Sequence, residues 1–110
     1  MKNDRVLALL GLANKAGGVA SGEFACECAI KDGKAHVVIV GKDASDNTRK
    51  KFRNSCEYYG VPYYEYATKE ELGRHIGKEM RASVAVTNAG LAGSLIKLLD
   101  SSNLGGSIDG

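Results

Sequence analysis

Apolar and polar residues alternate along the chain in two patterns, one with the period of a helix and one typical of buried strands. The apolar positions 6, 9, 10 and 13 recur at helical spacing and predict a first helix, which should end at Gly17 and Gly18. Residues 36–40 contain four consecutive β-branched residues, too few for a helix, and predict a strand buried on both faces. The same reasoning predicts further strands over 19–21, 59–67 and 82–88, and further helices over 21–33, 48–59, 68–77 and 89–99.

Side-chain patterns also predict how several of these elements begin and which way they face. We expect Ser21 to cap the second helix, and Pro62 to place its strand at an edge of the sheet. Thr68 with Glu70 and Glu71 forms a capping signal for the fourth helix. The residues expected to face inward are Phe24, Cys28 and Ala29 on the second helix, Phe52, Cys56 and Tyr59 on the third, Leu72 and Ile76 on the fourth, and Leu91, Leu95 and Leu98 on the fifth.

The order of the elements, helix and strand in alternation, predicts an α/β fold. We expect a three-layer α/β/α sandwich around a small four-stranded mixed sheet. Residues 1–100 should form a single domain, and residues 101–110, which lack periodicity, a flexible tail. The first apolar patch is far shorter than the roughly 20 residues that span a bilayer, so we expect a cytoplasmic protein without membrane contact.

Composition narrows the chemistry that the chain can perform. The sequence has 110 residues, three cysteines and two histidines, and neither residue type is spaced as metal ligands are. Neither a nucleophile elbow of the G-x-S-x-G type nor a phosphate-binding glycine loop is present. We therefore expect buried thiols, no metal, no cofactor and no enzymatic activity.

The positive charge is concentrated in one segment, although the net charge is only +2. Residues 42–53 hold five basic and two acidic residues, a local charge of five minus two, or +3. The segment follows a buried strand, at the kind of strand end where open α/β sheets bind ligands. A basic run on a helix is more often a solvated face than a binding site, so charge alone does not identify a partner.

Several stretches, taken in order, resemble a known family. "SGEFACECAIKDGKAHVVIVGKDAS", then "YYGVPYYEY", then "TKEELGRHIGKE" before a strand of small residues is similar to the ribosomal protein L-seven-Ae family of kink-turn RNA binders, in its bacterial, ribosome-associated branch. The resemblance covers roughly residues 5–98. It implies the same sandwich, no catalysis, no cofactor, and folded RNA, ribosomal or other, as the partner. Ribosomal proteins are possible further partners, and we expect a monomer.

The resemblance also implies where RNA is bound. Three places are expected to contact it: the first turn of the second helix, the turn after the second strand, and the loop before the fourth strand. A helix N-terminus offers unpaired N–H groups to phosphates, while a guanidinium or an apolar side chain can lie against unstacked bases. The matching residues are Gly22, Glu23, Phe24, Ala25 and Cys28 on the helix, Lys42 and Asp43 in the turn, and Lys78, Glu79, Met80 and Arg81 in the loop.

This sequence departs from the family pattern at the helix start. Kink-turn binders carry Asn-Glu where this chain has Phe24 and Ala25, and Lys where it has Cys28. Phe and Ala cannot hydrogen-bond base edges, so RNA binding is the firmer expectation and kink-turn specificity the weaker one, with Glu23 as a substitute reader of bases.

Other interpretations remain open at this point. Gly22 could serve only a turn, Asp43 could only brace its own turn, and Met80 could belong to the core. The whole protein could instead be an interaction module of the translation machinery that uses Tyr63, Tyr64 and Tyr66. A small-ligand or enzymatic domain with a deep pocket beside Asp43 is the third interpretation.

Overall fold

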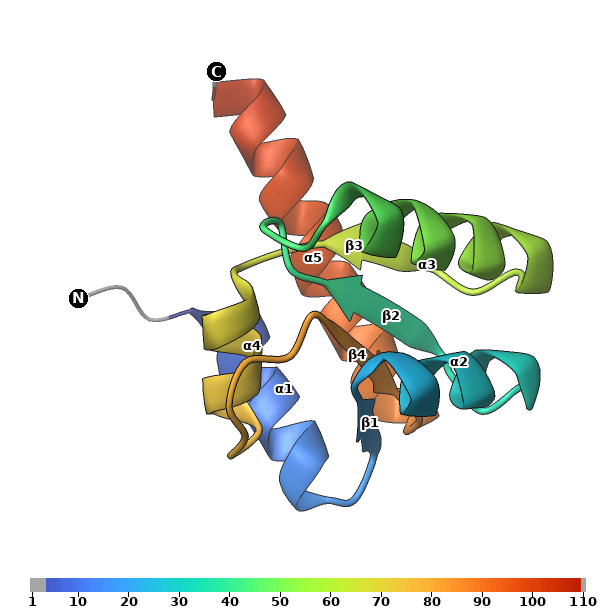
Figure 1. The fold of residues 1–110 in the computed structure, drawn as a ribbon. Helices are drawn as coiled ribbons and strands as arrows, with labels where there is room; N and C mark the ends of the chain where they lie inside the picture. Colours follow the sequence, from blue (N-terminus) through green and yellow to red (C-terminus); the bar gives the residue numbers. More distant parts are fainter. Residues whose placement is uncertain (1–3, 110) are drawn as a thin grey trace.

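The computed structural model describes the backbone of residues 4–109 and the side chains of residues 4–101, and in this part of the chain five helices alternate with four strands (Figure 1). This alternation is the one that the sequence predicts. In chain order the elements are α1 Arg5–Lys15, β1 Val19–Ser21, α2 Glu23–Lys31, β2 Val37–Val40, α3 Asp46–Tyr59, β3 Tyr63–Glu65, α4 Lys69–His75, β4 Ser83–Val86 and α5 Ala89–Asp109.

The four strands form one mixed sheet in the order β1-β4-β2-β3. β4 runs antiparallel to both β1 and β2, whereas β2 and β3 are parallel, with Val38 opposite Ala85 on one side and Tyr63 on the other. β3 lies at an edge, as Pro62 predicts. The two central strands are buried along their whole length, which the run of β-branched residues in 36–40 indicated.

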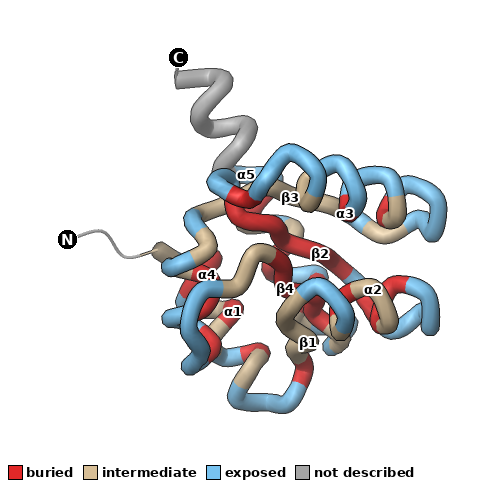
Figure 2. The backbone as a smooth tube through the Cα atoms, viewed as in Figure 1, coloured by how far each residue is buried: buried red, intermediate tan, exposed pale blue. Residues whose placement is uncertain are grey.

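Helices cover both faces of this sheet, so the predicted three-layer α/β/α sandwich is confirmed. Val37 and Ile39 of β2 point into a core built with α1, α4 and α5, while Val38 and Val40 point into a second core built with α2 and α3. Figure 2 shows the same division, with buried residues running through β2 and β4 and exposed residues on the outer sides of the helices.

Two helices, α2 and α3, expose a residue that the sequence predicts to face inward. In α2 the buried residues are Cys26, Ala29 and Ile30, whereas Phe24 is 79% exposed. The sequence offers two apolar stripes here, and packing against α3 and the sheet selects the one that contains Ile30. In α3 Tyr59, the last residue of the helix, is 44% exposed and packs edge-to-face on Tyr58.

The last helix is longer than the sequence indicates, because α5 continues to Asp109 through most of the segment 101–110. A flexible tail was expected there, and its flexibility remains a prediction. Over residues 4–109, no helix combines the length and the apolar character needed to cross a bilayer.

Candidate nucleic-acid interface

The three segments that the sequence singles out meet at one end of the sheet, which we call the loop end: residues 22–25, 41–43 and 78–81. They meet because β1 and β2 end there, and β4, antiparallel to both, begins there (Figure 1). Backbone hydrogen bonds tie these segments to residues 82 and 83 at the start of β4 and to residues 67 and 69 at the start of α4. These bonds run from Gly22 N to Ser83 O (3.1 Å), Gly41 N to Ala82 O (3.0 Å), Lys42 N to Ala67 O (2.8 Å) and Arg81 N to Lys69 O (3.0 Å).

α2 begins at the loop end without a side-chain cap. The prediction that Ser21 caps this helix is wrong, because Ser21 pairs with Val84 in the sheet and Gly22 takes the cap position instead. The N–H groups of residues 23–25 find no acceptor among the described residues. By contrast, side-chain oxygens cap the other four helices: Asp4 for α1, Ser45 for α3, Thr68 for α4 and Asn88 for α5.

Gly22 is required at this position by its backbone conformation. Its φ of 95° and ψ of 161° lie in a region that is essentially restricted to glycine. A Cβ placed on Gly22 would have no other atom within 4 Å, so the protein itself leaves the space in front of the helix open. Gly22 therefore does serve a turn, which the sequence offered as its alternative role. The same turn leaves the start of α2 open.

The turn after β2 combines a free cation with a structural carboxylate. Lys42 is exposed and forms no ion pair with any residue whose side chain is described. The Asp43 side chain accepts a hydrogen bond of 2.8 Å from the backbone N–H of Lys69, the first residue of α4. Asp43 thus holds the turn against α4, close to the bracing role considered from the sequence.

The loop 78–81 is held by a close approach to α4 at Gly73. The N–H of Lys78 donates to the carbonyl of Gly73 over 2.8 Å, and a Cβ on Gly73 would lie only 1.5 Å from the carbonyl oxygen of Glu79. Met80 is 56% exposed, so it does not belong to either core. An open hollow of about 370 Å³ lies beside the loop, lined by Glu70, Arg74, Lys78, Glu79 and Met80.

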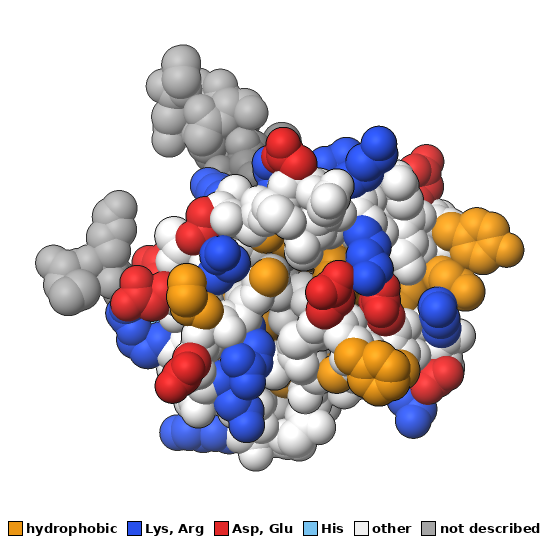
Figure 3. Space-filling view, in the orientation of Figure 1, with side chains coloured by type: hydrophobic (Ala, Val, Ile, Leu, Met, Phe, Trp, Pro, Cys, Tyr) orange, Lys and Arg blue, Asp and Glu red, His pale blue; other side chains and the backbone are white. Residues whose placement is uncertain are grey.

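Acidic neighbours neutralise much of the basic segment 42–53. Lys51 of α3 bridges to Glu23 at 2.8 Å and to Glu27 at 2.6 Å on α2, and these hydrogen bonds, that to Glu23 foremost, raise the pKa of its ammonium. Arg49 and Arg53 likewise pair with acidic side chains. Figure 3 shows basic and acidic groups interspersed on this face rather than one continuous basic field. The local charge of +3 therefore overstates the free positive charge.

The tyrosines of β3 and its continuation do not form an exposed contact surface. Tyr64 donates to Asp100 at 2.6 Å and Tyr66 donates to Asp4 at 2.9 Å, and both side chains are half-buried. Burial raises the pKa of each phenol to about 12. Tyr63 donates to Glu65 at 2.8 Å. The interaction module envisaged from these three tyrosines therefore lacks its surface.

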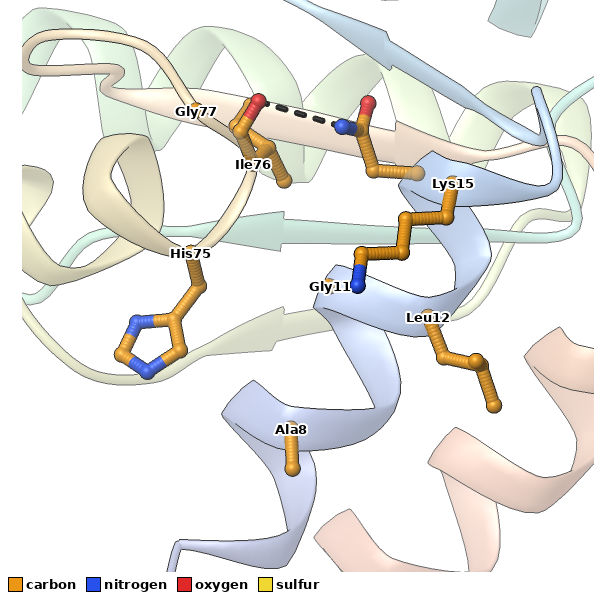
Figure 4. A pocket seen from close by; sticks show the side chains of 8 residues that line it. Ala8, Gly11, Leu12, Lys15, His75, Ile76 and Gly77 are labelled. Carbon is orange, nitrogen blue, oxygen red and sulfur yellow. Dashed lines mark hydrogen bonds between the residues drawn. The ribbon is translucent and has the colours of Figure 1, made fainter.

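The hollows of the described residues do not favour a small-molecule site beside Asp43. Three prominent hollows lie among the described residues, and Asp43 lines none of these three. One of about 410 Å³ lies between α1 and the end of α4, where Lys15 and His75 stand on either side (Figure 4). No three His, Cys, Asp or Glu side chains within residues 4–101 gather as metal ligands. Cys26 and Cys56 are buried, which raises the pKa of their thiols to about 11 and about 12.

Comparison with known proteins places the chain in a family. The model of the Ribosomal protein L7Ae/L30e/S12e/Gadd45 family matches residues 4–96. RNA-binding protein YlxQ of Bacillus subtilis (strain 168) is 50% identical over 92 residues, 84% of this chain and 92% of that protein. A protein of the same name from Enterococcus faecium is 37% identical over 84 residues, 76% of this chain and 82% of its own. The chain therefore belongs to the L7Ae/L30e/S12e/Gadd45 family, as the sequence motifs predicted.

Two solved structures share the fold of this chain. A Bacillus halodurans C protein described as having unknown function superposes with a TM-score of 0.86 at 35% identity, over 89% of this chain and 99% of that one. The Giardia lamblia 15.5kD RNA binding protein superposes with a TM-score of 0.75 over 92% of both chains. At 20% identity, the second likeness concerns the fold alone.

The structure brings the three predicted segments together, and two further residues that sequence reasoning missed shape them. The sequence pattern indicates only that Gly73 lies in the fourth helix, although a glycine inside so short a helix suggests a packing reason. Lys51 was counted only as part of a basic run. Its pairing with Glu23 depends on how α2 and α3 lie against each other, for which the sequence offers no local signal.

Proposed function

We propose that the chain is a non-catalytic, cytoplasmic RNA-binding protein that recognises structured, kink-turn-like RNA, ribosomal or ribosome-associated, through the loop end. The observation that carries this proposal is the uncapped start of α2. Three N–H groups and the positive end of the helix dipole face open space there, and phosphate oxygens are acceptors suited to such a position. The names of the two YlxQ relatives support RNA as the ligand.

The segments around the helix start supply complementary contacts. Lys42 is exposed and free to meet a phosphate, and the loop 78–81 offers a cation at Lys78 and an exposed apolar side chain at Met80. Arg81 is half-buried, and its guanidinium donates to the carbonyl of Met80 at 2.9 Å, so we assign it to shaping the loop as much as to contacting RNA. Phosphate contacts of this kind position an RNA without reading its sequence.

Base reading should be weaker here than in kink-turn binders that carry Asn-Glu at the helix start. Glu23, the alternative reader of base edges, is held by Lys51, and Cys28 lies half-buried further along α2. We therefore expect the protein to bind kinked RNA. It should discriminate only weakly against RNA variants in which the base pairs of the kink are changed. A good bidentate contact to a base typically contributes about 1–3 kcal/mol to the discrimination between bases. The side chains at the start of α2 supply no such contact.

The test compares two lysines that resemble each other. Lys42 and Lys50 are both exposed, and neither forms an ion pair within the part of the chain described with side chains, but only Lys42 lies at the loop end. RNA binding is measured for Lys42→Ala, Lys50→Ala and the unmodified protein at several salt concentrations. With a handful of contacts at about 0.7–0.9 each, the logarithm of affinity should fall against that of salt with a slope of about −2 to −4.

Lys42→Ala should weaken binding to all structured RNAs alike and make the slope shallower by about 1, whereas Lys50→Ala should change little. Binding that does not depend on salt would refute the proposal. Equal losses for the two variants would contradict binding centred on the loop end, because the control lysine lies outside it.

A further inference from the structure

Phe24 is exposed in a way that the fold does not explain. Its side chain is 79% accessible and belongs to neither core, although the same helix buries Cys26 and Ile30. An isolated exposed aromatic ring gains nothing from folding, because it stays in water in both states. Any function of the ring must therefore come from a partner.

The surroundings of Phe24 suit a nucleotide rather than an apolar protein face. Its own N–H and those of Glu23 and Ala25 are without acceptors among the described residues, so a partner that covers the ring must also satisfy these donors. An apolar partner surface would bury them unpaired, at a cost of about 1–3 kcal/mol each. A nucleotide brings both a flat base for the ring and phosphate oxygens for the N–H groups.

The pairing of Lys51 reduces the negative charge at the same turn and draws it away from Phe24. Without a partner, Glu23 would place a carboxylate beside Phe24, where it would repel phosphate. Lys51 holds the carboxylates of Glu23 and Glu27 within 2.8 Å of its ammonium, which offsets one of these two negative charges and directs Glu23 toward α3. Figure 3 shows exposed hydrophobic groups over the start of α2 with charged groups of both signs around them.

We propose that Phe24 is a stacking platform on which an unpaired base of the bound RNA lies, while the phosphates beside that base meet the free N–H groups of α2. This inference rests on the proposed RNA-binding function and specifies its ligand: an RNA with at least one extruded, unpaired nucleotide. Every base has a π-face, so the platform accepts all four bases with similar affinity. Stacking on Phe24 thus replaces hydrogen bonding to base edges at this position by a contact that tolerates changes of the RNA sequence.

The experiment uses the full chain and a synthetic RNA duplex with an internal bulge, in which 2-aminopurine replaces each unpaired base in turn. Phe24→Ala removes the ring and Phe24→Tyr keeps it. Tyr58→Ala is the matched control, because Tyr58 is 82% exposed but lies near the far end of α3, about 18 Å along that helix from Asp46. Circular dichroism confirms that each variant is folded.

Phe24→Ala should weaken binding about 5- to 150-fold, which corresponds to about 1–3 kcal/mol for one stacked base. Phe24→Tyr should bind within about threefold of the unmodified protein, and Tyr58→Ala should bind like it. At one bulge position, 2-aminopurine fluorescence should change on binding to the unmodified protein and to Phe24→Tyr, but not to Phe24→Ala. An abasic nucleotide at that position should lower the RNA affinity as much as Phe24→Ala does. Combining the abasic RNA with Phe24→Ala should cause no further loss of affinity.

Three outcomes would overturn the proposal. They differ in whether the proposed RNA-binding function also falls. If Phe24→Ala binds as tightly as the unmodified protein while Lys42→Ala is weaker, RNA binding stands and the platform does not, which leaves a protein partner for the ring. If Phe24→Tyr is as weak as Phe24→Ala, the ring does not act by stacking. If the unmodified protein binds no structured RNA at all, the proposed function falls together with this inference.

Discussion

Gly73→Ala tests how the loop 78–81 is held, without changing any side chain that could touch RNA. A Cβ at Gly73 would lie 1.5 Å from the carbonyl oxygen of Glu79 and 2.5 Å from its carbonyl carbon. These atoms are backbone, so no rotamer change relieves the overlap, and the loop must move away from α4. The hydrogen bond from Lys78 N to Gly73 O would be lost in the same movement.

The expected loss of stability follows from three contributions. Overpacking of this kind costs about 1–3 kcal/mol, and the lost hydrogen bond adds about 0.5–1.5 kcal/mol. Alanine is a better helix former than glycine, which returns about 1 kcal/mol. The net loss is therefore roughly 0.5–3.5 kcal/mol, and at about 4 °C per kcal/mol the melting temperature should fall by about 2–14 °C.

The control is Gly93→Ala, the same substitution on the exposed side of α5. A Cβ at Gly93 meets no atom within 4 Å, so this variant should gain about 0.5–1 kcal/mol of helix stability and bind RNA normally. Gly73→Ala should lose roughly tenfold in RNA affinity, or about 1.4 kcal/mol. If Gly73→Ala melts like the unmodified protein, the loop does not pack on α4. If it is destabilised but binds RNA with full affinity, the loop is not part of the interface.

Three further predictions concern the backbone, the pH dependence and the thiols. Gly22→Ala should lower the free energy of unfolding by about 1–3 kcal/mol, as chemical denaturation would measure, because alanine is strained at a φ of 95°, and an unchanged value would mean that the turn can adopt another conformation. Because the pKa of Tyr64 is raised from 10 to about 12, its contribution to stability should be complete below pH 10 and lost as the pH rises through 12. Denaturation between pH 10 and 12 should show a smaller loss of stability for Tyr64→Phe than for the unmodified protein. An equal loss would refute the role of Tyr64 in this pH dependence. A thiol reagent should label only Cys28 in the folded protein, since Cys26 and Cys56 are buried, and all three thiols after unfolding. Rapid labelling of a second thiol in the folded protein would contradict this burial.

The elements that could be predicted from sequence are those whose signals are local. The β-branched residues 37–40 identified the central strand, Thr68 and Glu71 identified the capping box of α4, and Pro62 identified the edge strand. Each of these signals acts through its own segment of backbone, so it does not depend on the rest of the fold. The three segments of the loop end came from the family resemblance, and the structure brings them together because β1 and β2 end where β4 begins.

The errors lie where distant parts of the chain decide the outcome. α2 is short and has two apolar stripes, and only its packing against α3 and the sheet selects the one with Ile30, which turns Phe24 outward. The neutralisation of Lys51 requires acidic partners from another helix. Gly22 could be recognised as important, but only its position after β1 shows that it leaves α2 uncapped.

Backbone amide shifts in a titration of the isotope-labelled protein with a bulged RNA duplex test the central claim most directly, because the unpaired N–H groups of α2 are themselves observed. We expect the largest shifts in residues 23–25, 41–43 and 78–81, and these shifts should saturate together at one RNA per protein. Largest shifts at the opposite end of the sheet, in residues 34–36 and 58–62, would contradict it, as would a titration that leaves residues 23–25 unmoved.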